Sequence, residues 1–362
     1  MNRILAIKMR AMGDTVIATA AFEALAQKGT LDVLVPAPWV SVLQENPAID
    51  GIYGAEEPKD FLGRLWFWLK TCFLLRAQNY DLILVFHCNF KTALIAKLIS
   101  FGKKTKMAVN HHKLKRSSWH QFLYEKFFTD FKVPDRGVLK PNLQRDLDLV
   151  RAIAGVTAVT PSVNLKVTDA EKLTAEEMLV GHGWLGARDP ILFLGVGASK
   201  ATKKWPASHY AELIEKIRAT DPRWKFLICT IADDEEWLKD FYKNVKNSKS
   251  IIHYKNIELR KVMAMLTYCQ AYLGNDSGLK HVAVALKIPT VTFFGPEDPF
   301  EWHPYDKNKN PYFYTENLPC RTESGNHWCS LEVCVKEKNK CLADISVENV
   351  FNVLVEMLKA RI

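Results

Sequence analysis

The 362-residue sequence contains no apolar run close to the roughly 18 residues that a membrane-spanning helix needs. Its first residues lack the pattern of a secretory signal peptide, because Lys8 and Arg10 interrupt the apolar stretch. Low-complexity tracts are also absent, and a chain with 48% hydrophobic and 25% charged residues has the composition of a globular protein. We therefore expect a cytoplasmic protein that is soluble or attached only peripherally to a membrane.

Several binding signatures are missing as well. No two of the eight cysteines form a C-x-x-C pair, so the zinc signal is weak. The four late cysteines, Cys320, Cys329, Cys334 and Cys341, are either reduced thiols that pack a loop or part of a disulfide or metal clip. The P-loop pattern G-x-x-x-x-G-K-[ST] does not occur. Helix-turn-helix, zinc-finger and RNP signatures are absent, which argues against a nucleic-acid partner.

Acidic residues are scarce in the first half of the chain. Residues 1–165 contain 22 Lys and Arg but 14 Asp and Glu, whereas residues 166–362 contain 27 and 26, so most of the net charge of +9 lies in the first half. Such an excess suits an anionic partner, which is nucleic acid, a membrane surface or a phosphorylated substrate.

Apolar strand-like runs alternate with helical patterns along the whole chain. The length favours two domains, and the alternation predicts a doubly wound parallel sheet in each. Residues 155–168, rich in Gly, Pro and Thr, suit a linker. We expect domains at 1–160 and 161–345, and a last helix, 346–362, that packs back toward the N-terminal domain. The expected strands are 4–9, 31–35, 80–86, 105–109, 190–197, 225–231, 250–254, 271–276 and 290–295; the expected helices include 16–25, 61–75, 90–100, 117–128, 143–154, 169–181, 207–218 and 347–358.

Two segments stand out within the first domain. FLGRLWFWLKTCFLL (61–75) is very apolar but carries Arg64 and Lys70. It is either a core helix or a helix that lies at a membrane interface. The basic stretch 103–116 is either a solvated surface or a site that binds phosphates.

Three loops combine glycine with charged or hydroxyl side chains. The first joins strand 4–9 to helix 16–25 and contains Arg10, Gly13 and Asp14. A capping carboxylate would stabilise the helix by roughly 1 kcal/mol. Because ligands of parallel sheets bind beyond the carboxyl ends of strands, Asp14 is also placed to act as a general base. Both roles stay open at this point.

The second loop, GVGASKATKKWP (195–206), again follows a strand and precedes a helix. Gly195 and Gly197 would let the backbone approach a ligand, and Ser199 offers a hydroxyl. Lys203 and Lys204 add positive charge. With the N–H groups of a helix start, these features suit either a phosphate site or an ordinary polar turn.

The third loop lies in LGNDSGLKHVAVALKIP (273–289), where Asp276, Ser277 and Gly278 open a helix. Asp or Ser before a helix is most often an N-cap. The N–H groups at the start of this helix also suit an anion, and His281 would lie near the same end of the helix.

Together these residues resemble glycosyltransferase family 9, the family of ADP-heptose:lipopolysaccharide heptosyltransferases. The similar segments are RAMGDTVIATAAFEAL, GASKATKKWPASHYAELI and GNDSGLKHVAVALKIPTVTFFGPEDPFEWHPY, in this order along essentially the whole chain. The core D-S-G-L-x-H and the following F-F-G-P are the most specific part. The late cysteines, followed by Ile345 and Val347, resemble the family's C-terminal pattern.

The resemblance implies an α/β chain of GT-B fold, with two Rossmann-like doubly wound parallel-sheet domains that face each other across a cleft. It implies an inverting, metal-independent transferase without a cofactor. The enzyme would move heptose from ADP-L-glycero-D-manno-heptose to Kdo or heptose of the lipopolysaccharide inner core. Its partners would be this donor, the lipid A–Kdo acceptor and the cytoplasmic face of the inner membrane, with no nucleic acid. The alternative is a transferase of the same family that uses another nucleotide sugar or glycan acceptor.

The resemblance also implies roles for single residues. Asp14 would be the catalytic base, and Lys203 would assist catalysis; Lys203 is preferred to Lys204 because the family lysine lies two residues before the tryptophan. The nucleotide-sugar site would consist of Gly13, Ser199, Lys203, Asp276, Ser277, Gly278 and His281. The family's acidic residue near the nucleoside has three candidates, Asp233, Asp234 and Glu235. We expect the acceptor to meet the basic residues Arg10, Lys104, Lys113 and Arg116.

Two positions depart from the family pattern. Ala20 stands where many members have proline. At the end of the expected strand 80–86, FHCN (86–89) replaces the acidic, glycine-containing sequence that is usual in the family. Because this loop lies toward the acceptor in the family, the sequence leaves the identity of the acceptor undecided.

Overall fold

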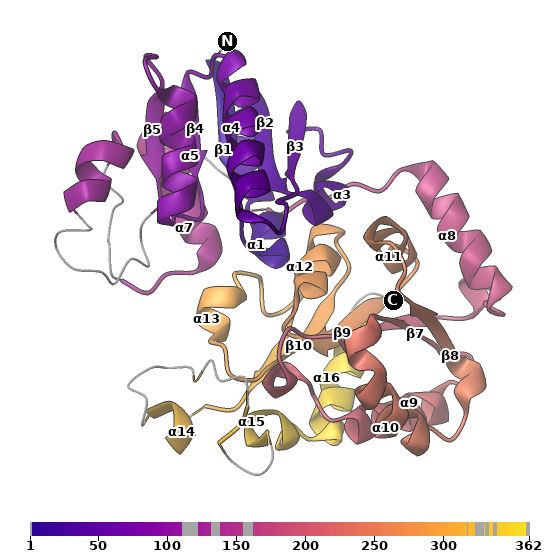
Figure 1. Cartoon of the computed structure of the whole chain (residues 1–362). Coiled ribbons are helices and arrows are strands. Elements are labelled where there is room, and N and C mark those ends of the chain that lie inside the picture. The colour runs from indigo at the N-terminus through magenta and orange to yellow at the C-terminus, as the bar shows by residue number, and fades with distance from the viewer. Residues whose placement is uncertain are drawn as a thin grey trace. The chain divides into compact units, whose positions relative to one another are not determined.

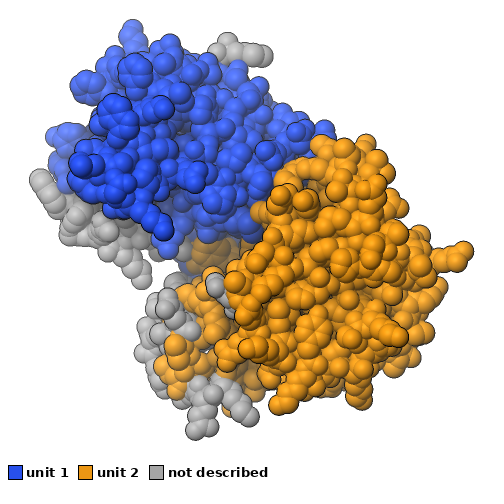
Figure 2. Space-filling model, turned by 45° about the vertical axis from the view of Figure 1, so that its right-hand side comes forward, with its two compact units in different colours: residues 1–166 blue, residues 167–362 orange. Residues whose placement is uncertain are grey.

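The computed structural model describes residues 2–110, 122–131, 138–154, 162–316, 318–322, 329, 333–335 and 339–359. The chain divides into two compact units, Met1–Lys166 (unit 1) and Val167–Ile362 (unit 2), shown in blue and orange in Figure 2. The boundary falls inside the linker that the sequence predicted. Among the described residues, no helix is both long and apolar enough to cross a bilayer.

Unit 1 is built on five parallel strands in the order β3-β2-β1-β4-β5 (Figure 1). Alternate residues of β1 enter two apolar layers. Ile4 and Ala6 pack in the layer that includes α2 and α7, whereas Leu5 and Ile7 pack in the layer that includes α4 and α5. A strand that is buried on both faces must be apolar throughout, which is why these runs were visible in the sequence.

The elements of unit 1 have the following bounds. The strands are β1 (Asn2–Ile7), β2 (Gly29–Pro36), β3 (Gly51–Ala55), β4 (Leu82–Val85) and β5 (Lys106–Val109). The helices are α1 (Met12–Ile17), α2 (Thr19–Ala26), α3 (Val40–Leu43), α4 (Phe61–Ala77), α5 (Phe90–Ser100) and α7 (Asn142–Ala154). A short 3₁₀ turn, η1, covers Ala37–Trp39, and a π-helical turn, η2, covers Tyr124–Phe128.

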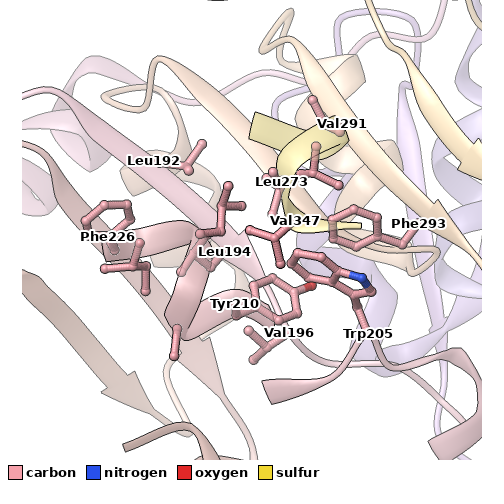
Figure 3. Packing of buried hydrophobic residues seen from close by; sticks show 14 of the residues in the cluster. Leu192, Leu194, Val196, Trp205, Tyr210, Phe226, Leu273, Val291, Phe293 and Val347 are labelled. Atoms are coloured by element: carbon pink, nitrogen blue, oxygen red, sulfur yellow. The ribbon is translucent and has the colours of Figure 1, made fainter. Parts of the chain in front are cut away.

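Unit 2 contains six parallel strands in the order β11-β10-β9-β6-β7-β8. Figure 3 shows the core on one face of this sheet. The Trp205 ring stacks on Phe293 at 4.3 Å between centroids, and Tyr210 meets its edge at 4.9 Å. The indole nitrogen of Trp205 donates to Ile345 O at 3.3 Å. Trp205 therefore fixes the end of the 195–206 loop within the core.

The elements of unit 2 complete the chain. The strands are β6 (Ile191–Gly195), β7 (Lys225–Thr230), β8 (Ile251–Lys255), β9 (Ala271–Asn275), β10 (Thr290–Phe294) and β11 (Tyr312–Tyr314). The helices are α8 (Asp169–Gly181), α9 (Ala207–Thr220), α10 (Glu235–Asn244), α11 (Leu259–Leu266), α12 (Gly278–Ala285), α13 (Pro299–Trp302), α14 (Pro319–Thr322), α15 (Lys340–Ala343) and α16 (Val347–Lys359). The 3₁₀ turns are η3 (Gly186–Arg188), η4 (Ala201–Lys203), η5 (Ala232–Asp234) and η6 (Ser248–Ser250).

Some expected elements differ from the structure. Helix 16–25 is interrupted at Ala18 and forms α1 and α2, and the sequence missed the edge strands β3 and β11. The expected helix 117–128 lies partly outside the described residues, and its last part is the turn η2. The apolar face of α16 contributes Val350 and Leu354 to the core of unit 2, whereas the sequence suggested packing toward the N-terminal domain.

The strand order reverses at one place in each sheet. In unit 1, β1 and β4 are neighbours; in unit 2, β6 and β9 are neighbours. Doubly wound sheets bind ligands at the carboxyl ends of the strands at such a switch point. All three candidate loops follow one of these strands: the first follows β1, the second β6 and the third β9.

Candidate functional site

In unit 1, Asp14 lies in the first turn of α1, directly beyond the end of β1. It occupies the third helical position, and the N-cap is Ala11. Ala11 N donates to Asp14 Oδ2 over a long 3.4 Å, whereas Asn142 Nδ2 donates to Asp14 Oδ1 at 3.0 Å. The carboxylate is therefore linked to a side chain of α7, 128 positions along the chain, and Asp14 is not itself the N-cap of α1.

A buried ion pair lies next to Asp14. Lys8 follows β1 directly, and its Nζ lies 2.9 Å from Asp146 Oδ2, with both side chains almost fully buried. Burial raises the pKa of Asp146 to about 6; the charge of Lys8 opposes the rise, and the charge of Asp14 adds to it. Asn142 and Asp146 are one turn apart on α7. One face of α7 thus holds both Asp14 and Lys8.

In unit 2, Asn275 joins the second and third loops. This fully buried residue ends β9. Its Nδ2 donates to Val196 O at 2.7 Å, and its Oδ1 accepts from Trp205 N at 2.8 Å. Asn275 therefore holds both ends of the segment that contains Ser199 and Lys203.

Asp276 forms ion pairs with two lysines. Lys203 Nζ lies 2.7 Å from Asp276 Oδ2, and Lys280 Nζ lies 2.7 Å from Asp276 Oδ1. Lys280 is fully buried, donates to Trp302 O at 2.9 Å and lies 4.5 Å from the centre of the Phe294 ring. Although burial favours the neutral acid, the charges of Lys280 and Lys203 hold the pKa of Asp276 well below its usual range. Two cations on one carboxylate leave a net charge of one positive unit.

The start of α12 adds backbone donors beside this cluster. Ser277 is the N-cap, but its side chain makes no capping hydrogen bond; its Oγ lies 3.3 Å from Tyr272 Oη. Gly278 is the first residue of the helix. Neither Asp276 nor Ser277 therefore acts as an ordinary cap. The first N–H groups of a helix have no partner within it and favour an anion.

His281 lies one turn into α12 and is buried. Its Nδ1 is 2.6 Å from Tyr305 Oη. Burial and the positive charge of Lys280 hold the pKa of His281 well below its usual range, so the ring is neutral at pH 7. A neutral imidazole can hydrogen-bond a ligand without adding charge to the Lys203–Asp276–Lys280 cluster.

The other half of the second loop faces a different part of unit 2. Ser199 is exposed, and with Lys204 and Trp237 it lines a cavity of about 750 Å³ between this loop and α10. Lys203 and Asp276 are not among the described residues that line this cavity. Of the two residues expected to hold one diphosphate, Ser199 therefore lines this cavity, whereas Lys203 pairs with Asp276.

The glycines of the second loop serve different purposes. A Cβ on Gly195 would lie 2.0 Å from Tyr272 Oη, so this glycine is needed for internal packing rather than for the close approach of a ligand. A Cβ on Gly197 would meet no described atom nearer than Asp234 Oδ2, at 3.7 Å. Gly197 is therefore the glycine at which space remains.

Two of the three nucleoside candidates already have partners. Lys204 Nζ lies 2.6 Å from Asp234 Oδ1, and Ile231 N donates to Asp234 Oδ2 at 3.2 Å. Glu235 is exposed and pairs with Lys255. The side chain of Asp233 lies outside the described part of the chain. Asp234 therefore orders the loop through Lys204.

The structure covers the expected acceptor residues only in part. Arg10 and Lys104 are exposed on unit 1, whereas Lys113 and Arg116 lie outside the described residues. Cys320, Cys329, Cys334 and Cys341 form no disulfide in the part that the structure describes. No group of three or more metal-ligating side chains occurs in that part either.

Sequence reasoning missed Lys280, Asn275, Asn142 and the Lys8–Asp146 pair. A weak signal existed for two of them. Lys8 lies in an otherwise apolar run, and Asn142 and Asp146 are four residues apart in a helical segment, so they share a face. Nothing in the sequence shows which strand end that face meets.

Comparisons with known proteins identify the family of this chain. A family model described as glycosyltransferase family 9 (heptosyltransferase) matches residues 68–327. Lipopolysaccharide heptosyltransferase 3 of Escherichia coli strain K12 is 22% identical over 307 residues, which cover 83% of this chain and 84% of that protein. The residues matched by the family model include the second and third loops but not the first.

Solved structures show the same fold. The glycosyl transferase family 9 protein of Veillonella parvula superposes with a TM-score of 0.79 at 20% identity and covers 99% of this chain and 97% of its own. The ADP-heptose lipopolysaccharide heptosyltransferase II of E. coli superposes with a TM-score of 0.75 at 20% identity and covers 99% of both chains. The two parallel-sheet units are thus those of the GT-B fold. The chain belongs to glycosyltransferase family 9, the lipopolysaccharide heptosyltransferase family, and is a glycosyltransferase.

Proposed function

We propose that this enzyme transfers heptose from ADP-L-glycero-D-manno-heptose to Kdo or heptose of the lipopolysaccharide inner core, with inversion and without a metal. The observation that carries the proposal is the Lys203–Asp276–Lys280 cluster, which has a net positive charge and lies beside the start of α12 at the switch point of unit 2. A diphosphate matches this combination of charge and backbone donors. The names of the related E. coli proteins support ADP-heptose as donor and lipopolysaccharide as acceptor.

The bond-forming step needs a base on the acceptor side. An acceptor hydroxyl oxygen attacks the anomeric carbon, the bond from that carbon to the ADP oxygen breaks, and the hydroxyl proton passes to Asp14. Attack from the face opposite ADP inverts the configuration. Asn142 donates to Asp14 Oδ1 and Ala11 N makes a long contact to Oδ2, so both groups orient the carboxylate that would accept the proton. A positioned base typically contributes about 10²–10⁴ in rate.

The leaving group needs stabilisation because negative charge grows on the ADP oxygen. Lys203 is the cation of the cluster that remains partly exposed, whereas Lys280 is fully buried. Lys203 would therefore contact the diphosphate, while Lys280 keeps Asp276 ionised and holds it in place. Preformed charges and N–H groups of this kind stabilise a developing anion without reorganisation.

The direct test is incubation of the purified protein with ADP-heptose and truncated lipopolysaccharide acceptors, followed by mass spectrometry. We expect the acceptor to gain one heptosyl residue, also in the presence of EDTA. Parallel reactions with ADP-glucose, UDP-glucose and GDP-mannose test the alternative donors. Transfer from one of these sugars, but not from ADP-heptose, would refute the heptose assignment and leave the family assignment intact.

A further inference from the structure

Helix α4 exposes a continuous apolar stripe. Leu65 and Trp66 lie three and four residues after Leu62, Leu69 follows them at four and three residues, and Phe73 lies four residues after Leu69, so the five side chains share one side of the helix. All five are exposed, Trp66 to 71% and Phe73 to 77%. Cys72 and Leu75 of the same helix are buried in the core, so the helix is anchored on the sheet while its apolar stripe is exposed. Of the two interpretations of 61–75, a helix that is buried throughout in the core does not match this exposure.

Helix α5 carries a second stripe beside the first. Phe90, Leu94 and Leu98 are spaced by four residues and are exposed, as is Phe101 directly after the helix. Both helices cover the same face of the unit 1 sheet and pack against each other (Figure 1). The two stripes form one surface, which we call the α4–α5 face. Monomeric soluble proteins rarely expose apolar patches of this extent.

The charged residues of the two helices themselves have a single sign. Residues 61–77 and 90–106 contain eight lysines and arginines and no aspartate or glutamate. Arg64, Lys70, Lys97 and Lys104 are exposed there. An apolar surface with aromatic residues and surrounding cations matches the interface of an anionic bilayer, where the rings enter the headgroup region and the cations meet lipid phosphates.

We propose that the α4–α5 face docks this enzyme on an anionic phospholipid bilayer. A second copy of the chain is the less suitable occupant, because it would bring two surfaces of net positive charge together. The inference deepens the proposed function, since an acceptor carried by a lipid is met at such a surface. The docking itself needs neither donor nor acceptor, so it can be tested separately.

Vesicle flotation tests the proposal with the full chain. We expect the protein to float with vesicles that contain phosphatidylglycerol and to stay largely unbound with phosphatidylcholine alone. The double variant Trp66→Ser/Phe73→Ser should bind at least tenfold more weakly. Arg64→Gln/Lys97→Gln should lose about fivefold per residue. The matched control is Leu173→Ser/Leu185→Ser, which removes two leucines that are 62% and 68% exposed on unit 2; it should bind like the wild type.

Quenching by brominated lipids locates the contact. Ten tryptophans contribute to the fluorescence, and we expect Trp66→Phe to bind normally but to lose a distinct part of the quenching. Equal quenching in the wild type and in Trp66→Phe would overturn the proposal. Equal binding of the serine double variant, or a dimer in ultracentrifugation that this variant converts to monomer, would overturn it as well. Transfer to a water-soluble acceptor fragment should persist in that variant, so failure of docking and failure of the transferase assignment are distinguishable.

Discussion

Lys280 offers a sharp test of how the unit 2 cluster is held together. Replacing it by methionine keeps most of the side chain but removes the donor to Asp276 Oδ1 and Trp302 O. Breaking a buried ion pair from one side typically costs about 3–5 kcal/mol. Because Asp276 keeps Lys203 as a partner, we expect Lys280→Met to lower the free energy of unfolding by about 3 kcal/mol, toward the lower end of that range.

The pH dependence of this loss follows from Asp276. Its folded-state pKa is depressed by Lys280 and Lys203, so its contribution is present above the unfolded pKa of about 3.9 and is lost as the pH falls through the folded pKa. Without Lys280 the folded pKa rises, and Asp276 takes up a proton at higher pH. The stability difference between Lys280→Met and the wild type should therefore be largest near pH 7 and shrink toward pH 4.

Urea unfolding at pH 7 and at pH 4.5 measures both effects. The control is Lys249→Met, an exposed lysine of the same unit, which should stay within about 0.5 kcal/mol of the wild type. The variant also removes the excess positive charge of the cluster, so calorimetry should show weaker ADP binding. A loss below about 1 kcal/mol at pH 7, or a larger loss at pH 4.5 than at pH 7, would refute the account of Lys280.

The remaining predictions concern the neighbours of this cluster and of Asp14. Lys203→Ala should weaken ADP binding in calorimetry by about tenfold or more, and unchanged affinity would remove Lys203 from the donor site. Asn142→Ala should lower kcat about tenfold with little change in KM, because Asp14 loses the donor that orients it; a change in KM alone would contradict this. Burial raises the folded pKa of Asp146 to about 6, so its stabilising contribution is full below about pH 4 and is lost as the pH rises to 6, a change of about 3 kcal/mol. Asp146→Asn should abolish that part of the pH profile in urea unfolding, and parallel profiles for both proteins would show the prediction to be wrong.

The fold was largely predictable because parallel strands that are buried on both faces appear in the sequence as short apolar runs. YDLILVF and KFLICTI, for example, became β4 and β7 almost as expected. The missed strands lie at sheet edges. In β3, Gly51 and Gly54 lie against Asp32 and against Ala37 and Val40, where a Cβ would collide, so the glycines that weaken the strand signal are required by packing. Local sequence does not show that constraint.

In the candidate site, too, some residues were predictable from local sequence and others were not. Asp14, Lys203 and Asp276 stand in loops whose glycines and charges are visible in sequence. Asn142 is important only because α7 brings it to the end of β1, and Asn275 only because it spans both ends of a loop. Such roles depend on contacts between distant segments, which spacing alone does not reveal.

The most direct test of the transferase account is the turnover of Asp14→Asn with ADP-heptose and a truncated lipopolysaccharide acceptor. The substitution preserves size and leaves an oxygen for Asn142 but removes the base. We expect kcat to fall about 10²–10⁴-fold, with ADP affinity close to that of the wild type in calorimetry. Turnover within a few-fold of the wild type would contradict the account, because Asp14 would then only stabilise the first turn of α1.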